Sequence, residues 1–236
     1  MTTIKQQDVI ESVADALQYI SYYHPLDFVQ ALEKAYHKEQ SQAAKDAIAQ
    51  ILINSRMSAE GKRPICQDTG IVTCFVKVGM AVQWDRHDMT VQEMVDEGVR
   101  RAYTNPDNPL RASVVADPAG KRQNTRDNSP AVVHIDMVPG DAVDIQIAAK
   151  GGGSENKTKM VMLNPSDDVA EWVEKTLPTM GAGWCPPGML GIGIGGTAEK
   201  AAVLAKESLM EHIDIQALIE RGPDNADEAL RLDIFD

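Results

Sequence analysis

Residues 63–79, with the sequence RPICQDTGIVTCFVKVG, join a polar turn to an apolar segment. Pro64 fixes its own φ and biases the residue before it toward extended backbone, so the turn is stiff. Cys66 lies beside an amide, a carboxylate, a hydroxyl and a turn glycine, which is unusually dense chemistry for a connection. The β-branched and aromatic residues from Ile71 onward predict a buried strand. A plain loop with an inert buried thiol remains the alternative.

The composition is that of a globular protein with room for a hydrophobic core. The chain has 236 residues, of which 43% are hydrophobic, enough for one large or two small domains. Its net charge of -12 argues against a nucleic-acid partner but allows an anionic small substrate. The charged N-terminal segment is unlike a signal peptide, and no apolar run is long enough for a bilayer. We therefore expect a soluble, cytoplasmic protein without a membrane partner.

The order of the sequence patterns predicts an α+β fold, with N-terminal helices followed by mixed strands and helices. Apolar spacing predicts helices over 7–59, interrupted at Pro25, while 60–236 forms the α+β part. Thr90 is a good N-cap for the next helix. Two alternating runs at 131–138 and 141–150 predict an antiparallel hairpin. Farther on, we expect a helix near 167–181 and a short apolar strand leading into another helix.

The glycine-rich sequence GIGIGG at 191–196 fits the pattern G-x-G-x-x-G before a helix. A dinucleotide-binding module is therefore one hypothesis. However, a Rossmann half needs further βαβ units, and only 40 residues follow Gly196 (236 − 196 = 40). Close packing of a strand on a helix is the stronger explanation for these glycines.

A second glycine-rich segment, KGGGSENKTK at 150–159, offers consecutive backbone N–H groups. Ser154, Asn156, Lys157 and Thr158 add side-chain donors directly after it. Such a nest suits phosphate or carboxylate, although the spacing differs from a Walker A loop. A flexible turn is the alternative.

Three cysteines, an odd number far apart in sequence, do not form a disulfide framework. Cys185 precedes two prolines, which suits a metal ligand on a stiff backbone. Cys74 lies inside the apolar run and is expected in the core. No cysteine or histidine spacing typical of zinc is present, and we interpret the five histidines as surface or structural residues.

Several motifs recur together in a characteristic order: RPICQDTG, NPLR, NTRDNSP, AKGGGSENKTKM and CPPGMLGIGIGGTAEKA. From about residue 8 to the end, the chain resembles the N-terminal region of iron-sulfur class I fumarate hydratases and tartrate dehydratase α subunits. The glycine-rich segment is more similar to the fumarase form. The resemblance implies a hydro-lyase that interconverts (S)-malate and fumarate plus water, with a tartrate dehydratase α-type subunit as the alternative.

The resemblance also implies a [4Fe-4S] cluster held by three cysteines. Cys66 and Cys185 would be two of its ligands, and the third would lie downstream of this chain. Asp68 would be catalytic. The substrate-binding residues implied are Gln67, Asp68, Arg111, Gly153, Ser154, Asn156, Lys157 and Thr158.

By the same resemblance, residues 1–236 would form the N-terminal catalytic domain of a two-part enzyme. The segment NADEALRLDIFD at 225–236 resembles the start of a helix that ends at an acidic residue without a basic or glycine cap. We therefore expect a fragment that is inactive alone. The expected partners are a small dicarboxylate, the C-terminal domain of the same enzyme and, at full length, a second copy in a homodimer.

Overall fold

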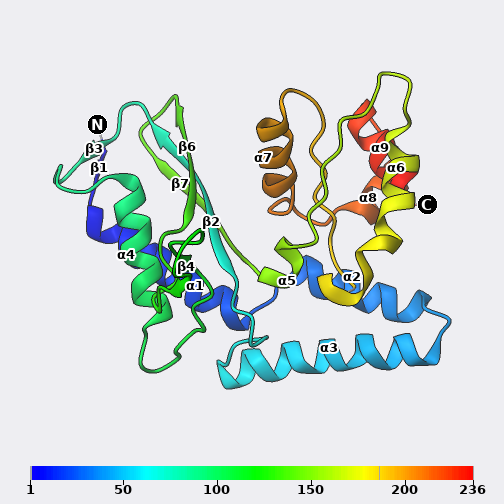
Figure 1. Cartoon of the computed structure of the whole chain (residues 1–236), viewed down its shortest axis with the longest axis horizontal. Coiled ribbons are helices and arrows are strands. Elements are labelled where there is room, and N and C mark those ends of the chain that lie inside the picture. Colours follow the sequence, from blue (N-terminus) through cyan, green and yellow to red (C-terminus); the bar gives the residue numbers. More distant parts are fainter. Residues whose placement is uncertain (1, 186, 236) are drawn as a thin grey trace. The chain divides into compact units, whose positions relative to one another are not determined.

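The computed structural model describes residues 2–185 and 187–235, which divide into two compact units (Figure 1). The first, here called the sheet unit, comprises the chain up to Pro25 together with Ala35–Gly152. The second, the helical unit, comprises Leu26–Lys34 together with the chain from Gly153 onward. The boundary between them therefore falls inside the glycine run of the segment KGGGSENKTK.

Helices dominate both units, and strands occur in the sheet unit among the described residues. The sheet unit contains α1 (Gln6–Tyr22), α3 (Gln42–Gly61), α4 (Val91–Tyr103), β1 (Thr3–Ile4), β2 (Ile71–Gly79), β3 (Gln83–Trp84), β4 (Val115–Ala116), β5 (Gln123–Asn124), β6 (Val132–Val138) and β7 (Val143–Lys150). The helical unit contains α6 (Val169–Thr176), the 3-10 helix η1 (Leu177–Trp184), α7 (Ala198–Ser208), α8 (Ile215–Arg221) and α9 (Ala226–Phe235). Two helices cross the boundary, α2 (Leu26–Lys38) and α5 (Gly152–Glu155). This composition confirms the predicted α+β class.

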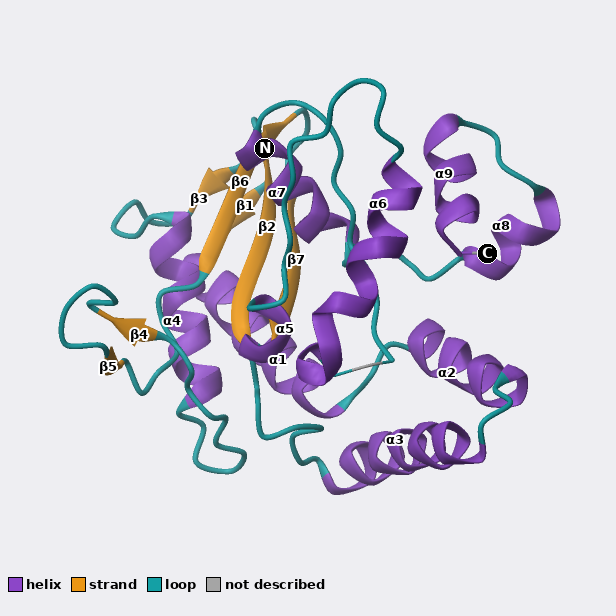
Figure 2. Cartoon of the chain, turned by 45° about the vertical axis from the view of Figure 1, so that its right-hand side comes forward, coloured by secondary structure: helices purple, strands orange, loops and turns teal. Residues whose placement is uncertain are grey.

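The main sheet has three strands, and β2 lies in its centre between β6 and β7 (Figure 2). β2 pairs with β6 in parallel and with β7 in antiparallel orientation. The predicted hairpin of 131–138 with 141–150 is therefore wrong, because both strands pair with β2 instead of with each other. The short connection after β6 passes the end of β2, where the Gly79 N–H donates to Ala142 O at 2.8 Å. β2 is apolar on both faces over most of its length, which favours the central position.

Helices α1 and α4 provide the other layer of the core. Val13 and Leu17 of α1 and Val95 and Val99 of α4 are almost completely buried against β2. Gly98 permits the close approach of the two helices, since a Cβ there would lie 2.7 Å from the Val13 side chain. The predicted start of α4 is confirmed by a capping box, in which the Thr90 side chain accepts from the backbone of Glu93. The sequence pattern thus identified the core faces of both helices correctly.

The first 61 residues contain three helices, as the periodicity predicts in outline. Pro25 is the N-cap of α2, and Ser41 caps α3 through a hydrogen bond from Ala44 N–H. The apolar spacing that predicts a helix here, which includes Ile48 and Met57, matches the burial of α3 only in part, because Ile48 is buried while Met57 is 63% exposed. None of the described helices has the length and apolar character that a membrane span needs.

The predicted apolar strand before α7 does not form, because the described residues from 187 to 194 have no strand partner. This segment instead lies directly on α7. A Cβ at Gly191 would be 2.1 Å from Ala205 O, and one at Gly193 would be 2.1 Å from Ala201 O. The glycines of GIGIGG therefore let the backbone touch the helix, which supports their interpretation as packing residues.

Candidate functional site

The segment Cys66–Gly70, here called the cysteine turn, leads directly into β2. Cys66 is exposed, and its thiol donates to Gln67 Oε1 at 3.3 Å. The Asp68 N–H points back at the Cys66 sulfur at 3.4 Å. A backbone donor to sulfur stabilises a thiolate, as the hydrogen bonds around iron-sulfur ligands do. The turn thus presents an accessible thiol with a backbone donor at its sulfur.

The Asp68 carboxylate connects this turn to the glycine-rich segment. Its Oδ1 accepts from Gly70 N–H at 3.2 Å, and its Oδ2 accepts from Gly152 N–H at 2.8 Å. There is little room beside it, because a Cβ at Gly151 would lie 3.0 Å from Oδ2. An ionised carboxylate has about four acceptor sites, so two backbone donors leave capacity for a substrate proton or hydroxyl.

Arg111 is the last residue of the NPLR motif, and its backbone contacts the same turn. The Thr69 hydroxyl donates to Arg111 O at 2.6 Å. The Arg111 guanidinium is exposed and forms no ion pair with any residue of the described chain. The structure therefore brings Cys66, Asp68 and Arg111 onto contacting loops of one unit.

Two residues that hold the cysteine turn were missed by the sequence analysis. The Tyr103 hydroxyl, at the end of α4, donates to Thr69 O at 2.6 Å and to Gly70 O at 3.2 Å. Burial raises the pKa of Tyr103, and the nearby Asp68 charge adds to this, so the phenol stays a donor. Asn128 donates to the same Gly70 carbonyl at 3.0 Å. In the sequence, the one indication of such a role was that Asn128 lies inside the NTRDNSP motif.

In the helical unit, the expected anion nest is a single helical turn, α5, followed by a tight bend. The N–H groups of Lys157 and Thr158 donate to Ser154 O and Glu155 O at 3.1 and 3.2 Å. Gly153 and Asn156 are exposed. Because the Gly152 N–H is already bonded to Asp68, fewer backbone donors are open than the nest hypothesis assumed.

The same bend lies against the segment before Cys185. The Ser154 hydroxyl donates to Trp184 O at 3.3 Å. The Lys157 side chain covers Gly183, where a Cβ would lie only 2.7 Å from Lys157 Cε. Ser154 and Lys157, both predicted to bind substrate, therefore contact the two residues that precede Cys185, the second predicted cluster ligand.

Cys185 itself is exposed and has a left-handed backbone, with φ of 61°. Its N–H donates to Ala182 O at 3.0 Å, which ends η1. The first of the two prolines invoked to stiffen this turn, Pro186, lies outside the described residues. Within the described residues, no group of three His, Cys, Asp or Glu side chains gathers to hold a metal. Each unit thus supplies one exposed thiol.

Cys74 is different from the other two cysteines, as predicted. It is completely buried in β2. Burial, together with the charge of Asp96, raises the pKa of its thiol to about 12. A neutral thiol in an apolar layer is a core residue and a poor metal ligand.

These settings predict the order in which the thiols react. In the native, metal-free chain at pH 8, Ellman's reagent should modify Cys66 and Cys185 rapidly and leave Cys74 unmodified. Denaturant should expose Cys74 and raise the count from two thiols to three. Cys66→Ser and Cys185→Ser variants assign the rapid reactions. Modification of native Cys74 at the rate of Cys66 would contradict the buried position.

Comparisons with known proteins agree with the resemblance seen in the motifs. The sequence profile described as "Fumarate hydratase (Fumerase)" matches residues 10–236. The "Putative L(+)-tartrate dehydratase subunit alpha" of Methanocaldococcus jannaschii is 35% identical over 211 residues, covering 87% of this chain and 73% of that protein. The "L(+)-tartrate dehydratase subunit alpha" of Escherichia coli K12 is 30% identical over 240 residues, covering 97% and 76%. The chain therefore belongs to the fumarate hydratase (Fumerase) family of hydro-lyases.

Proposed function

We propose that this chain forms part of a hydro-lyase that removes water from a 2-hydroxy dicarboxylate, with L(+)-tartrate as the first candidate substrate. The observation that carries the proposal is the cysteine turn. Its Asp68 is bonded to Gly152, and its Thr69 is bonded to the backbone of Arg111. Cys66, Asp68 and the backbone of Arg111 thereby lie on contacting loops, an arrangement that supports a site built from these three residues.

The choice of tartrate rests on the relatives. The motifs by themselves favour (S)-malate and fumarate, with a tartrate dehydratase α-type subunit as the alternative. The names of the similar proteins favour that alternative. (S)-Malate stays the second candidate because the glycine-rich segment around Ser154 resembles the fumarase form. Both substrates have two carboxylates and a hydroxyl, so the same residues could bind either.

The side chains of the sheet unit have distinct proposed roles. Arg111, exposed and without an ion-pair partner among the described residues, would bind one substrate carboxylate through its planar fork. Gln67 would orient the substrate through its amide. Asp68, anchored by two backbone N–H groups, would accept and hold a proton at a carboxylate oxygen. Fixed donors keep this carboxylate in place without occupying all of its lone pairs.

The helical unit would contribute further donors to the substrate. Ser154, Asn156, Lys157, Thr158 and the backbone of Gly153 are the candidates. Lys157 is placed beside the backbone before Cys185, as its packing on Gly183 shows. It would supply a positive charge to the substrate from this bend.

Cys66 and Cys185 would be two of the ligands of a [4Fe-4S] cluster, whose third ligand would come from a companion chain or domain. The donors present fit that role, because both thiols are exposed and Cys66 receives an N–H bond at its sulfur. When bound, such a cluster supplies a Lewis acid for the hydroxyl that leaves. A companion chain or C-terminal domain would complete the site, since the relatives are named as α subunits. A homodimer of the complete enzyme remains a further proposal.

The substrate test uses the assembled enzyme, purified without oxygen through a tag on this chain in its own cells. Loss of water from L(+)-tartrate is followed as oxaloacetate, and loss of water from (S)-malate as fumarate. We expect kcat/KM for L(+)-tartrate to exceed that for (S)-malate at least about tenfold, a difference of about 1.4 kcal/mol. A preference for (S)-malate would support the second candidate. Inactivity on both, with the cluster absorbance present, would contradict the substrate class.

A further inference from the structure

We propose that Asn128 is a positioning residue of this site, whose buried amide sets the distance between the cysteine turn and the segment that carries Arg111. The positioning itself is a property of the sheet unit. Its consequence for catalysis rests on the proposed function.

The Asn128 side chain bonds to both segments at once. Its Nδ2 donates to Gly70 O at 3.0 Å, at the end of the cysteine turn. Its Oδ1 accepts from Ser113 N–H at 2.6 Å and from Val114 N–H at 3.2 Å, two and three residues after Arg111. Asn128 is fully buried, with an exposed fraction of 0%. Water therefore cannot replace any of these three bonds without opening the structure.

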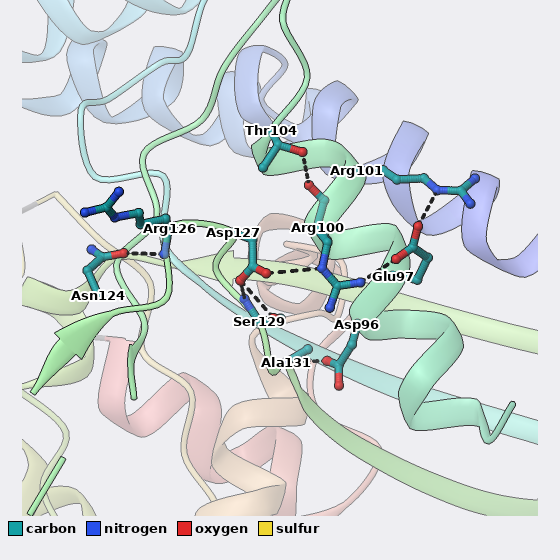
Figure 3. Close-up of polar contacts among 10 residues, drawn as sticks. All are labelled: Asp96, Glu97, Arg100, Arg101, Thr104, Asn124, Arg126, Asp127, Ser129 and Ala131. Carbon is teal, nitrogen blue, oxygen red and sulfur yellow. Dashed lines mark hydrogen bonds and ion pairs between the residues drawn. The ribbon is translucent and has the colours of Figure 1, made fainter. Parts of the chain in front are cut away.

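The backbone around Asn128 is fixed to α4, so the amide has a rigid base (Figure 3). Asp127 accepts from Arg100 Nε at 3.2 Å and from Ser129 N–H at 3.0 Å. Partial burial opposes ionisation of Asp127, yet these hydrogen bonds and the Arg100 charge lower its pKa overall. Two residues farther on, Ala131 N–H donates to Asp96 Oδ1 at 2.7 Å. The loop is held on both sides of Asn128.

An asparagine suits this position for two physical reasons. Its φ is 62°, in the left-handed region that Asn occupies more readily than most residues. Its amide can donate and accept at the same time, whereas an ionised carboxylate can only accept. The neighbouring Arg126 also has a positive φ of 69°, but its side chain extends away from Arg100 and Asp127 (Figure 3).

The consequence for the site is geometric. Thr69, within the turn, also donates to Arg111 O, and Tyr103 donates to the turn, but among the described hydrogen bonds only Asn128 joins the Gly70 carbonyl to the amides after Arg111. Loss of this link lets Arg111 move relative to Asp68 and Cys66. A displacement of about 1 Å between positioned groups can lower a rate about 100-fold.

Two variants separate the two halves of the link. Asn128→Gly keeps the left-handed backbone and removes all three side-chain hydrogen bonds. Asn128→Asp keeps the acceptor for Ser113 and Val114 and, when ionised, loses the donor to Gly70. Gln6→Glu is the matched control, because Gln6 is also 0% exposed and its amide donates to Arg86 O and Met89 O, away from the turn.

Hydrogen exchange of this chain tests the positioning without reference to activity. In Asn128→Gly, the amides of Ser113 and Val114 should exchange at least about tenfold faster than in the wild type, and the cysteine turn should also exchange faster. In Asn128→Asp at pH 8, the turn should exchange faster while Ser113 and Val114 keep most of their protection. Gln6→Glu should leave both segments unchanged. Wild-type exchange in both segments of Asn128→Gly would overturn the proposal.

Kinetics of the assembled enzyme test the consequence. Asn128→Asp should lower kcat/KM about 10- to 100-fold while the iron content and visible absorbance stay at wild-type levels. Gln6→Glu should keep wild-type kinetics. Wild-type kinetics of Asn128→Asp would overturn the catalytic part of the proposal. A wild-type enzyme inactive on every 2-hydroxy dicarboxylate would instead contradict the proposed function, and the exchange result would still decide the positioning role.

Discussion

Cys66→Ser and Cys185→Ser are each expected to abolish iron-sulfur binding and activity together, whereas Cys74→Ala should retain both. The first two thiols are exposed on turns, and the third is buried with its pKa raised to about 12. A serine hydroxyl is a much poorer iron ligand than a thiolate. The variants are introduced into the assembled enzyme, purified without oxygen, and compared by visible absorbance, iron content and rate.

Cys74→Ala serves as the control for the loss of a sulfur as such. Removal of a small buried group should cost about 1 kcal/mol of unfolding free energy without affecting iron. A cluster retained in Cys185→Ser but lost in Cys74→Ala would contradict this assignment, and the buried thiol would then have to be a ligand.

Local patterns were sufficient to predict much of the sheet unit. The faces of α1 and α4 that pack on the sheet follow from three- and four-residue spacing, and Val13 and Val95 are buried as that spacing requires. Thr90 forms the cap that its residue type favours. Cys74 lies in the core, as expected for a small apolar residue inside a β-branched run. Each of these features depends on neighbours within about two helical turns.

The order of the strands could not be read from local patterns. The period-two alternation of β6 and β7 is compatible with pairing to each other or to a third strand. The third strand, β2, is apolar on both faces and gains most from the central position. That choice depends on contacts between segments about 60 residues apart, which periodicity does not report.

The candidate site was predictable in its residue types but not in its connections. Cys66 and Asp68 stand out in the sequence because a thiol and a carboxylate share a turn. The bond from Asp68 to Gly152, by contrast, spans 84 positions of sequence. Asn128 and Tyr103 carry no local signal of their contact with Gly70, since a buried amide or phenol is recognised only by what surrounds it.

Gly70→Ala is expected to destabilise the sheet unit by about 2–5 kcal/mol, combining a strained backbone with overpacking. Gly70 has φ of +85°, and a Cβ there would lie 2.6 Å from Ala149 C and 2.8 Å from Ala149 O. Those atoms belong to the backbone of β7, so no side-chain rotation relieves the clash. The carbonyl of Gly70 also receives the bonds from Tyr103 and Asn128, so a shift would loosen the cysteine turn.

The measurement uses Cys74 as a probe of the sheet unit, in a background where Cys66 and Cys185 are serine. The rate at which Cys74 becomes available to a thiol reagent under native conditions reports the free energy of opening. Gly70→Ala should raise that rate about 30-fold or more, since each 1.4 kcal/mol corresponds to a factor of ten. Gly140→Ala is the matched control, because Gly140 has φ of +118° with no atom within 4 Å of its Cβ position. It should cost only the backbone strain, about 1 kcal/mol. Equal rates in the two variants would show that β7 moves aside to admit the methyl group, and the close contact of the cysteine turn with β7 would then be unnecessary for the fold.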